Sequence, residues 1–187
     1  GKQEILVVGH IRGPYGRKPS PTKIDVIQRM KNACESPSEV RLFLGACLFY
    51  HVWIPHFAHI VDPLYQLLRK NKKFEWESKH SNAMQQLKDL LVNARVLRKP
   101  DYSCEKTIIV TVDTSSIGIG WALSQKDIEE NRYAIRFGAK VLNPRPRPYA
   151  QVKRGLWGVV TTLKTDHNYL IGVPMIVETD CLPLLGW

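Results

Sequence analysis

The sequence predicts an α/β (α+β) fold in which a helical region is followed by a mixed β-sheet with a packed helix. Apolar residues recur at helical spacing up to about residue 98, and from Lys106 they follow the spacing of strands. Three strand-like segments follow one another directly, and a helical segment separates them from a fourth. This order favours a mixed sheet with a helix on one face. We therefore expect two parts, residues 1–98 and 99–187.

The helical part contains a clear helix start. Ser36 can act as the N-cap, Pro37 as the first helical residue and Glu39 as the reciprocal acceptor of a capping box. The apolar residues that follow repeat at helical spacing and predict one buried face; they are Val40, Phe43, Leu44, Cys47 and Leu48.

Prolines and glycines divide the rest of this part. In residues 1–23 a short apolar strand is followed by glycines and prolines that interrupt any helix. Pro55 and Pro63 predict two short helices in residues 56–70, since proline disfavours a helix interior. A further helix is expected from about Ser78 to Val92, with one apolar side formed by Met84, Leu87 and Leu91.

The second part reads as strand, strand, strand, helix, strand. The expected strands are residues 107–113, 118–125 and 133–142, with a polar hairpin turn at 126–132. A helix over 149–166 and a buried strand over 174–180, ending in Asp180, complete the pattern.

Composition limits the classes of protein that this chain can belong to. With 187 residues and 44% apolar composition it can bury a core, which excludes disorder as the main state. The net charge of +10 lies mainly in residues 1–98, which hold 16 Lys/Arg against 8 Asp/Glu. Such an excess suits a polyanionic partner or serves solubility alone. Four cysteines without metal-finger spacing favour a reduced, intracellular protein, and no apolar run is long enough for a membrane span.

Two strands end in a carboxylate, Asp113 and Asp180. If these strands are parallel neighbours, both carboxylates lie at one end of the sheet, where acidic groups can bind Mg²⁺ for phosphodiester hydrolysis. The alternative is that each aspartate only ends a strand. The residues His51, His56, His59 and Asp62 are interpreted as ordinary imidazoles and a carboxylate on short helices rather than a metal cluster.

Two basic segments are candidates for contacts with nucleic-acid phosphates, with solvated charge as the simpler alternative. The first follows a predicted helix, and the second is a proline-rich loop before the helix at 149–166. The candidate residues are Arg69, Lys70, Lys72, Lys73, Arg145 and Arg147.

Longer motifs carry a family resemblance. The segment "VRLFLGACLFYHVWIPHFAHIVDPLYQLLRKNKKFEW" resembles the region after the palm in Ty3/gypsy-type reverse transcriptases. The segments "VTVDTSSIGIGWALSQ" and "HNYLIGVPMIVETDCLPLL" resemble the RNase H domain that follows in the same pol polyproteins. The resemblance implies the end of the palm plus a helical thumb or connection region in residues 1–98, joined to an incomplete RNase H-like domain in residues 99–187. It also implies an RNA/DNA hybrid or another nucleic acid as a partner, and other parts of a pol polyprotein as protein partners. The expected location is a cytoplasmic particle or the nucleus, without a membrane.

The resemblance implies Mg²⁺-dependent cleavage of RNA as the ancestral activity, and assigns Asp113 and Asp180 as catalytic and metal-binding residues. Gly155 stands where the family has its glutamate, Lys153 where an earlier glutamate is usual, and the chain ends at Trp187 before the region of the fourth carboxylate. The Tyr-x-Asp-Asp polymerase motif is absent. We therefore expect a degenerate, impaired or inactive nuclease that still binds nucleic acid. The alternatives are an active ribonuclease H, completed by Glu178 or a missing segment, and a non-enzymatic interaction module.

Overall fold

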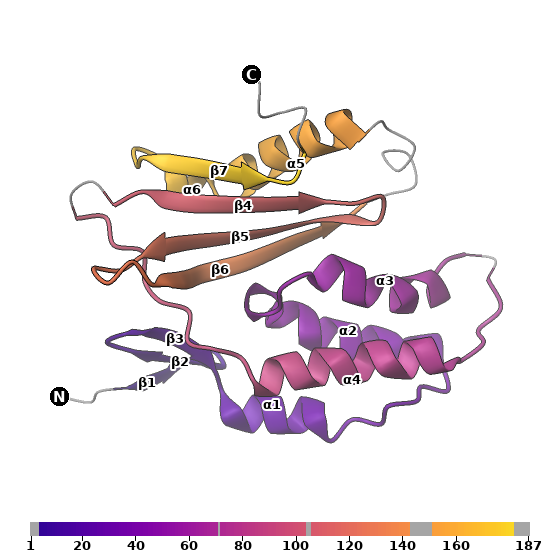
Figure 1. Ribbon diagram of the computed structural model, residues 1–187. Coiled ribbons are helices and arrows are strands. Elements are labelled where there is room, and N and C mark those ends of the chain that lie inside the picture. Colours follow the sequence, from indigo (N-terminus) through magenta and orange to yellow (C-terminus); the bar gives the residue numbers. More distant parts are fainter. Residues whose placement is uncertain (1–3, 71, 104–105, 143–150, 182–187) are drawn as a thin grey trace.

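The computed structural model describes residues 4–70, 72–103, 106–142 and 151–181, and it contains two sheets and two groups of helices (Figure 1). The first sheet is antiparallel, in the order β1-β2-β3, and lies before the helices. Its short strands were only partly expected, because the glycines between them hide any strand-like pattern. They are β1 (Ile5–Val7), β2 (His10–Gly13) and β3 (Gly16–Pro19).

The helical part follows this sheet. Four α-helices and one 3₁₀ turn contribute to its core, and the first of them, which begins with a proline, was not expected. They are α1 (Pro21–Gln28), α2 (Pro37–Phe49), η1 (His51–Trp53), α3 (Phe57–Leu67) and α4 (Ser78–Val92). The predicted start of α2 is confirmed, because the Ser36 side chain accepts a hydrogen bond from the Glu39 backbone N–H. The Glu39 carboxylate accepts from the Glu35 N–H, one residue before the expected position.

The second sheet is mixed, as predicted. Its order is β6-β5-β4-β7, in which β4 pairs antiparallel with β5 and parallel with β7. The strands are β4 (Ile108–Thr114), β5 (Gly118–Lys126), β6 (Arg132–Val141) and β7 (Met175–Thr179). Helices α5 (Gln151–Thr165) and α6 (His167–Leu170) connect β6 to β7.

Each face of this sheet belongs to a different core. Apolar residues of β4 and β5 pack with α5 on one face, where Trp157 and Leu163 lie against buried strand residues. On the other face, Phe137 and Val141 of β6 pack against the core of the helical part. The main chain joins the two parts again where the Arg98 N–H donates to the Ala134 carbonyl over 2.9 Å.

Two helical expectations are wrong. Pro63 lies inside the single helix α3 and does not separate two helices. A proline in a helix interior costs about 3 kcal/mol, because it removes one backbone hydrogen bond and its ring clashes with the preceding turn. Burial of each large aliphatic side chain contributes about 1.5–3 kcal/mol, and α3 buries several along one face. Leu48, expected on the apolar face of α2, is 49% exposed, because helical packing covers only the narrower stripe of Val40, Phe43, Leu44 and Cys47.

The strand at residues 174–180 is also less buried than expected. Met175 and Ile176 of β7 are 40% and 55% exposed, because β7 is the last strand of the sheet in the described part of the chain and has one neighbour there. No helix among the described residues is long and apolar enough to cross a membrane.

Candidate nuclease-like site and adjoining cavity

The two strand-end aspartates lie at the same end of the sheet. In the parallel pair, Val112 of β4 is opposite Thr179 of β7. The next residues are Asp113, which is the second-last residue of β4, and Asp180, which directly follows β7. Buried residues of β4 alternate with more accessible ones: Val110 and Val112 belong to the core beneath α5. The alternation directs Asp113 to the face away from α5. The predicted convergence of the two strand ends is thus present in the fold.

A histidine from the helical part contacts Asp113. His56 directly precedes α3, and its Nδ1 lies 3.6 Å from Asp113 Oδ2. The His56 backbone has φ of 53°, in the left-handed region that is uncommon for residues other than glycine. Its side chain is 66% exposed and that of Asp113 is 46% exposed. The Asp113 carboxylate is therefore open to solvent and has a basic neighbour.

Glu178 of β7, a further acid near this end of the sheet, is bound by an arginine. Its carboxylate accepts hydrogen bonds from Arg132 Nη2 and Thr111 Oγ1, both over 2.9 Å. The hydrogen bond from Arg132, followed by that from Thr111, lowers the pKa of Glu178 below its usual value. Glu178 is thus an ionised carboxylate whose charge is balanced by Arg132.

Helix α5 packs against β4 and has no side chain with a carboxylate. Its sequence, QVKRGLWGVVTTLKT, contains no aspartate or glutamate. Gly155, Gly158 and two threonines are its buried residues. A Cβ atom added at Gly158 would lie 2.3 Å from Thr114 Oγ1, so the helix and the strand are in close contact here. The helix therefore supplies packing to the end of β4 but no acidic side chain.

We expect Gly158→Ala to lower the free energy of unfolding by about 1–2 kcal/mol. An approach of 2.3 Å falls in the upper part of the range for overpacking, about 2–3 kcal/mol, and alanine recovers about 1 kcal/mol of helix propensity. Thermal unfolding of the variant measures the effect. The double variant Thr114→Ala/Gly158→Ala lacks the Thr114 hydroxyl that contacts the added Cβ, so it should recover most of the lost stability. A single variant as stable as the starting protein would show that this contact is not close.

The histidines of η1 and of the start of α3 do not form a metal cluster. The His51 Nδ1–H donates to the Leu48 carbonyl over 2.7 Å, and His59 Nε2 lies 3.0 Å from Ser115 Oγ. Asp62 accepts from the Gln66 side chain. Within the described ranges, no group of three His, Cys, Asp or Glu side chains could hold a metal ion. The interpretation as ordinary helix residues agrees with these contacts.

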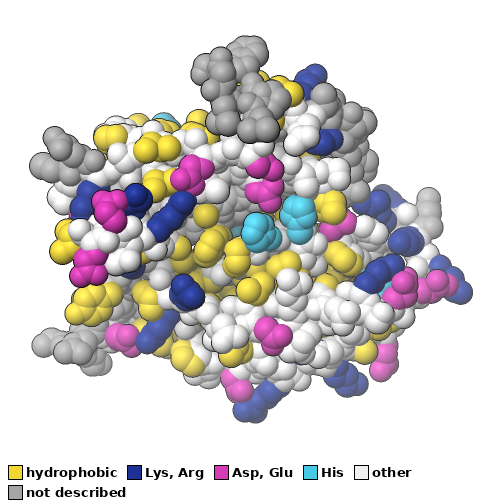
Figure 2. Space-filling view, viewed as in Figure 1, with side chains coloured by type: hydrophobic (Ala, Val, Ile, Leu, Met, Phe, Trp, Pro, Cys, Tyr) yellow, Lys and Arg dark blue, Asp and Glu magenta, His cyan; other side chains and the backbone are white. Residues whose placement is uncertain are grey.

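The first predicted basic segment lies on the surface. Arg69, Lys70, Lys72 and Lys73 are all exposed and follow α3. Figure 2 shows Lys and Arg side chains gathered at the end of the molecule where α3 leads to α4. Lys73 also pairs with Glu75 over 3.0 Å. The second pair, Arg145 and Arg147, lies outside the described residues.

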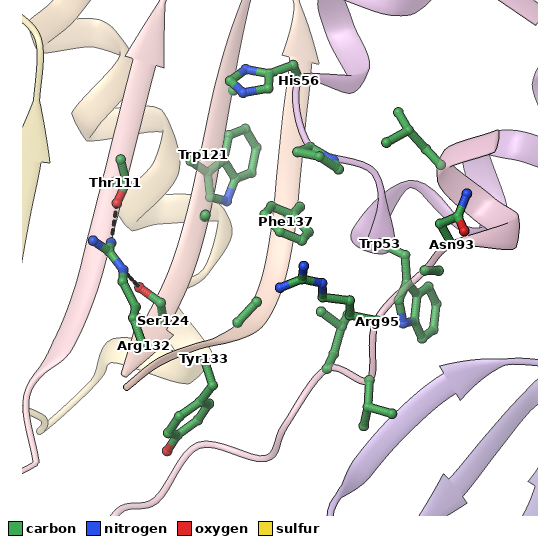
Figure 3. A pocket seen from close by; sticks show the side chains of 18 of the residues that line it. Trp53, His56, Asn93, Arg95, Thr111, Trp121, Ser124, Arg132, Tyr133 and Phe137 are labelled. Atoms are coloured by element: carbon green, nitrogen blue, oxygen red, sulfur yellow. Dashed lines mark hydrogen bonds between the residues drawn. The ribbon is translucent and has the colours of Figure 1, made fainter. Parts of the chain in front are cut away.

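A cavity that the sequence did not indicate adjoins Asp113. It has a volume of about 730 Å³ and lies between the sheet face and the segment after α4 (Figure 3). Asp113 and His56 line it together with Trp53, Phe137 and Arg95. No local pattern could have predicted it, because its walls come from segments far apart in the chain.

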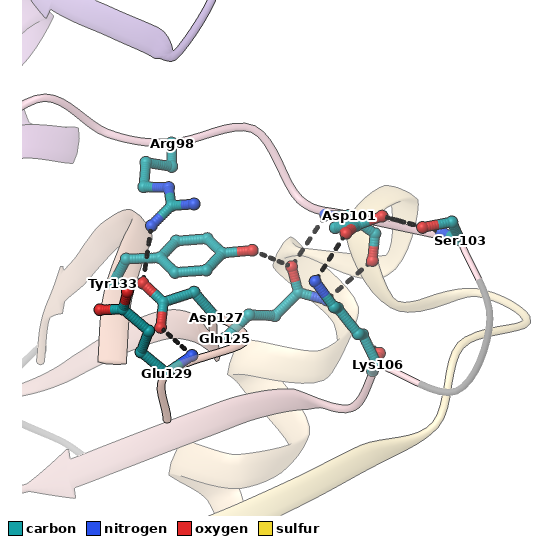
Figure 4. A network of polar contacts seen from close by, with 8 residues as sticks. All are labelled: Arg98, Asp101, Ser103, Lys106, Gln125, Asp127, Glu129 and Tyr133. Carbon is teal, nitrogen blue, oxygen red and sulfur yellow. Dashed lines mark hydrogen bonds and ion pairs between the residues drawn. The ribbon is translucent and has the colours of Figure 1, made fainter. Parts of the chain in front are cut away.

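The segment that bounds this cavity is fixed by polar contacts. The Arg98 guanidinium lies 3.8 Å from the centre of the Tyr133 ring and pairs with Asp127 over 3.3 Å (Figure 4). Farther along, Asp101 pairs with Lys106 over 2.8 Å. Hydrogen bonds from Lys106 and then Ser103 hold the pKa of Asp101 well below its usual value. The crossing from the helical part to β4 is therefore anchored on the sheet.

Comparisons with known proteins agree with this fold. Residues 76–177 match the family model described as the RNase H-like domain found in reverse transcriptase. The retrovirus-related Pol polyprotein from transposon 297 of Drosophila melanogaster is 32% identical over 98% of this chain, and the transposon Tf2-3 polyprotein of Schizosaccharomyces pombe is 26% identical over 99%. The chain spans only 17% and 14% of the length of these relatives.

Solved structures show the same architecture. The foamy viral protease-reverse transcriptase in complex with dsDNA has a TM-score of 0.77 at 19% identity, covering 100% of this chain and 39% of that one. The same protein in complex with an RNA/DNA hybrid has a TM-score of 0.76 at 19% identity, covering 95% of this chain and 24% of the other. This similarity establishes the arrangement of the elements, from the first sheet to β7.

Proposed function

Because the chain belongs to the family of RNase H-like domains found in reverse transcriptase, we propose that it is a nucleic-acid-binding part of a retroelement polyprotein with an impaired or inactive nuclease centre. The observation that carries the proposal is helix α5, which packs on β4 and contains no acidic residue. The resemblance places the family's glutamate at Gly155, a buried position in that helix. The helix thus lacks the carboxylate that the ancestral reaction requires.

The acidic residues present do not fit a centre for two Mg²⁺ ions. Two-metal hydrolysis places the ions about 4 Å apart, where their mutual repulsion must be offset by several carboxylates. Asp113 and Asp180 are the two candidates, and Glu178 is engaged by Arg132 and Thr111. His56 lies beside Asp113 and adds positive charge whenever it is protonated. These contacts favour a site that keeps the two aspartates of the family but does not hydrolyse RNA. They argue against the alternative in which Glu178 completes the metal centre.

The proposed nucleic-acid partner is an RNA/DNA hybrid. Two structural neighbours were solved with dsDNA and with an RNA/DNA hybrid, which supports a duplex partner for this architecture. Exposed basic residues after α3 offer positive charge without requiring a catalytic centre. We assign residues 1–98 to the end of a palm plus a thumb or connection-like part and residues 99–187 to the RNase H-like part, in keeping with the two cores.

Hybrid binding tests the proposal. Fluorescence anisotropy with a labelled RNA/DNA hybrid should show affinity that falls steeply with salt, since displaced counterions dominate phosphate binding. Replacement of Arg69, Lys70, Lys72 and Lys73 by glutamine should reduce the magnitude of the slope of log K against log salt. The reduction should be about 0.7–0.9 for each phosphate that the variant no longer neutralises.

A control with the same change of charge separates direct phosphate binding from net charge. Glutamine at the exposed residues Lys23, Arg29, Lys31 and Arg41, on and near α1 and α2, should leave the slope nearly unchanged. Equal effects of the two sets would contradict a binding surface after α3. Absence of binding by the unchanged protein at low salt would favour the non-enzymatic protein-interaction module.

A further inference from the structure

The cavity beside Asp113 is large enough for a small organic molecule. Its volume of about 730 Å³ falls within the roughly 300–1,000 Å³ of small-molecule sites. The walls are largely apolar, with Trp53 and Pro55 on one side and Phe137 of β6 on the sheet. Transfer of a flat apolar ligand from water into a cavity with such walls is therefore favourable.

Small residues on the sheet create this space. Gly120 and Ala122 of β5 line the cavity beside Ala134 of β6. A Cβ atom added at Gly120 would meet nothing within 4 Å, and the backbone there has no positive φ that would require glycine. A larger side chain at position 120 could therefore occupy the cavity without strain in the strand.

Arg95 supplies a positive charge that its surroundings do not balance. Figure 3 shows its guanidinium extending from the segment after α4 towards the sheet, below Phe137. Across the described parts of the chain, Arg95 takes part in no hydrogen bond, ion pair or ring contact. Arg132, which also lines the cavity, is by contrast paired with Glu178 over 2.9 Å. Arg95 is thus the guanidinium available to a ligand.

The charges are separated along the cavity. His56 lies at the end away from Arg95 in Figure 3, and the Asp113 carboxylate lies 3.6 Å from its Nδ1. The acidic group of a ligand bound at Arg95 would therefore lie far from the Asp113 carboxylate. The apolar part of the ligand can occupy the cavity between the two. A guanidinium binds carboxylate, sulfonate or phosphate through paired N–H groups.

We propose that this cavity binds a small aromatic anion, with the rings against Trp53, Phe137 and the small residues of the sheet and the acidic group on Arg95. Aromatic carboxylic acids and mononucleotides share this chemistry. The proposal is separate from hybrid binding, since the cavity is lined by residues other than the basic segment after α3.

The probe for the test is 8-anilinonaphthalene-1-sulfonate, compared with N-phenyl-1-naphthylamine, which has the same rings without the sulfonate. Titration of the intact protein should give saturable binding at one site per chain, with several-fold tighter binding of the sulfonate. In Arg95→Gln this preference should disappear, while the neutral probe binds as before. Arg41→Gln, at an exposed arginine of α2, is the matched control and should keep the preference.

Gly120→Val tests the location. It should weaken binding of both probes several-fold and leave the protein folded and about as stable, because valine suits a strand and its Cβ meets no atom within 4 Å. Unchanged probe binding in Gly120→Val, or an equal preference for the sulfonate in Arg95→Gln, would overturn the proposal. Displacement of the probe by adenosine 5′-monophosphate would identify nucleotides as the class of ligand. Displacement by 1-naphthoate alone would identify aromatic carboxylic acids. Failure of both to displace it would count against the proposal.

Discussion

Replacement of Arg136 by methionine is expected to lower the free energy of unfolding by about 3–5 kcal/mol, the usual cost of removing one partner from a buried ion pair. Arg136 Nη1 lies 2.8 Å from Asp166 Oδ1, and the Asp166 side chain is fully buried. Trp121 Nε1 also donates to Asp166 Oδ2 over 2.7 Å. Of these two partners, the Asp166 carboxylate would keep only the neutral Trp121 indole when Arg136 is replaced.

The destabilisation should depend on pH in a defined direction. Burial raises the pKa of Asp166, although Arg136 and then the Trp121 hydrogen bond oppose the shift. Removal of Arg136 raises this pKa further. A carboxyl group whose pKa is higher in the folded than in the unfolded state stabilises the folded protein at low pH. This contribution to stability is lost as the pH rises through the pKa of the folded state. The deficit of the variant should therefore be largest at neutral pH and shrink as pH falls towards the ordinary value of 3.8.

Urea unfolding of Arg136→Met at several pH values measures both effects. Arg132→Met is the matched control, because it breaks an ion pair whose two side chains are 41% and 44% exposed. Pairs of that kind contribute about 0–1 kcal/mol. A deficit below about 1 kcal/mol in Arg136→Met, or one that grows as pH falls, would contradict the assigned role of Asp166.

Lys88→Met is expected to lower the free energy of unfolding by about 2–4 kcal/mol. Lys88 of α4 is 2% exposed, and its ammonium group donates to the backbone carbonyls of Gln28 and Met30 and to Asn32 Oδ1. Methionine keeps the apolar volume and leaves these acceptors without their donor. Hydrogen bonds to charged groups contribute about 1.5–3 kcal/mol, and buried acceptors that lose a partner carry a further penalty.

Lys79→Met provides the control for Lys88, because Lys79 lies at the start of the same helix and is exposed. Its replacement should change stability by less than about 0.5 kcal/mol. Urea midpoints with an unchanged m-value would show that the difference lies in folding stability. Equal effects of the two substitutions would mean that Lys88 does not hold the end of α1 against α4.

The secondary structure was predictable where pattern and local chemistry agree. Helix α4 was expected at the residues it occupies, because its apolar repeat is regular and no proline interrupts it. The strand that contains Asp113 was expected because its apolar residues follow the spacing of a strand. Pro63 was misleading, since burial of one helix face outweighs a missing backbone hydrogen bond, and that burial depends on other segments.

The details of the site depend on contacts that local patterns do not contain. Lys88 looks like a solvated residue in the sequence, and only the carbonyls at the end of α1 explain its burial. Gly120 looks like an ordinary strand glycine in the sequence, and only the segments that enclose the cavity show that it borders open space. The engagement of Glu178 by Arg132 likewise depends on the pairing of β7 with β4 and on the place of β6.

Cleavage of an RNA/DNA hybrid is the direct test of whether the nuclease centre is inactive. The protein at saturating concentration is incubated with a hybrid carrying labelled RNA and either Mg²⁺ or Mn²⁺, and binding is measured by anisotropy in the same mixture. We expect the hybrid to be bound and its RNA to remain intact, with no difference between the unchanged protein and Asp113→Asn. Efficient RNA cleavage that Asp113→Asn abolishes would contradict the account and establish an active nuclease.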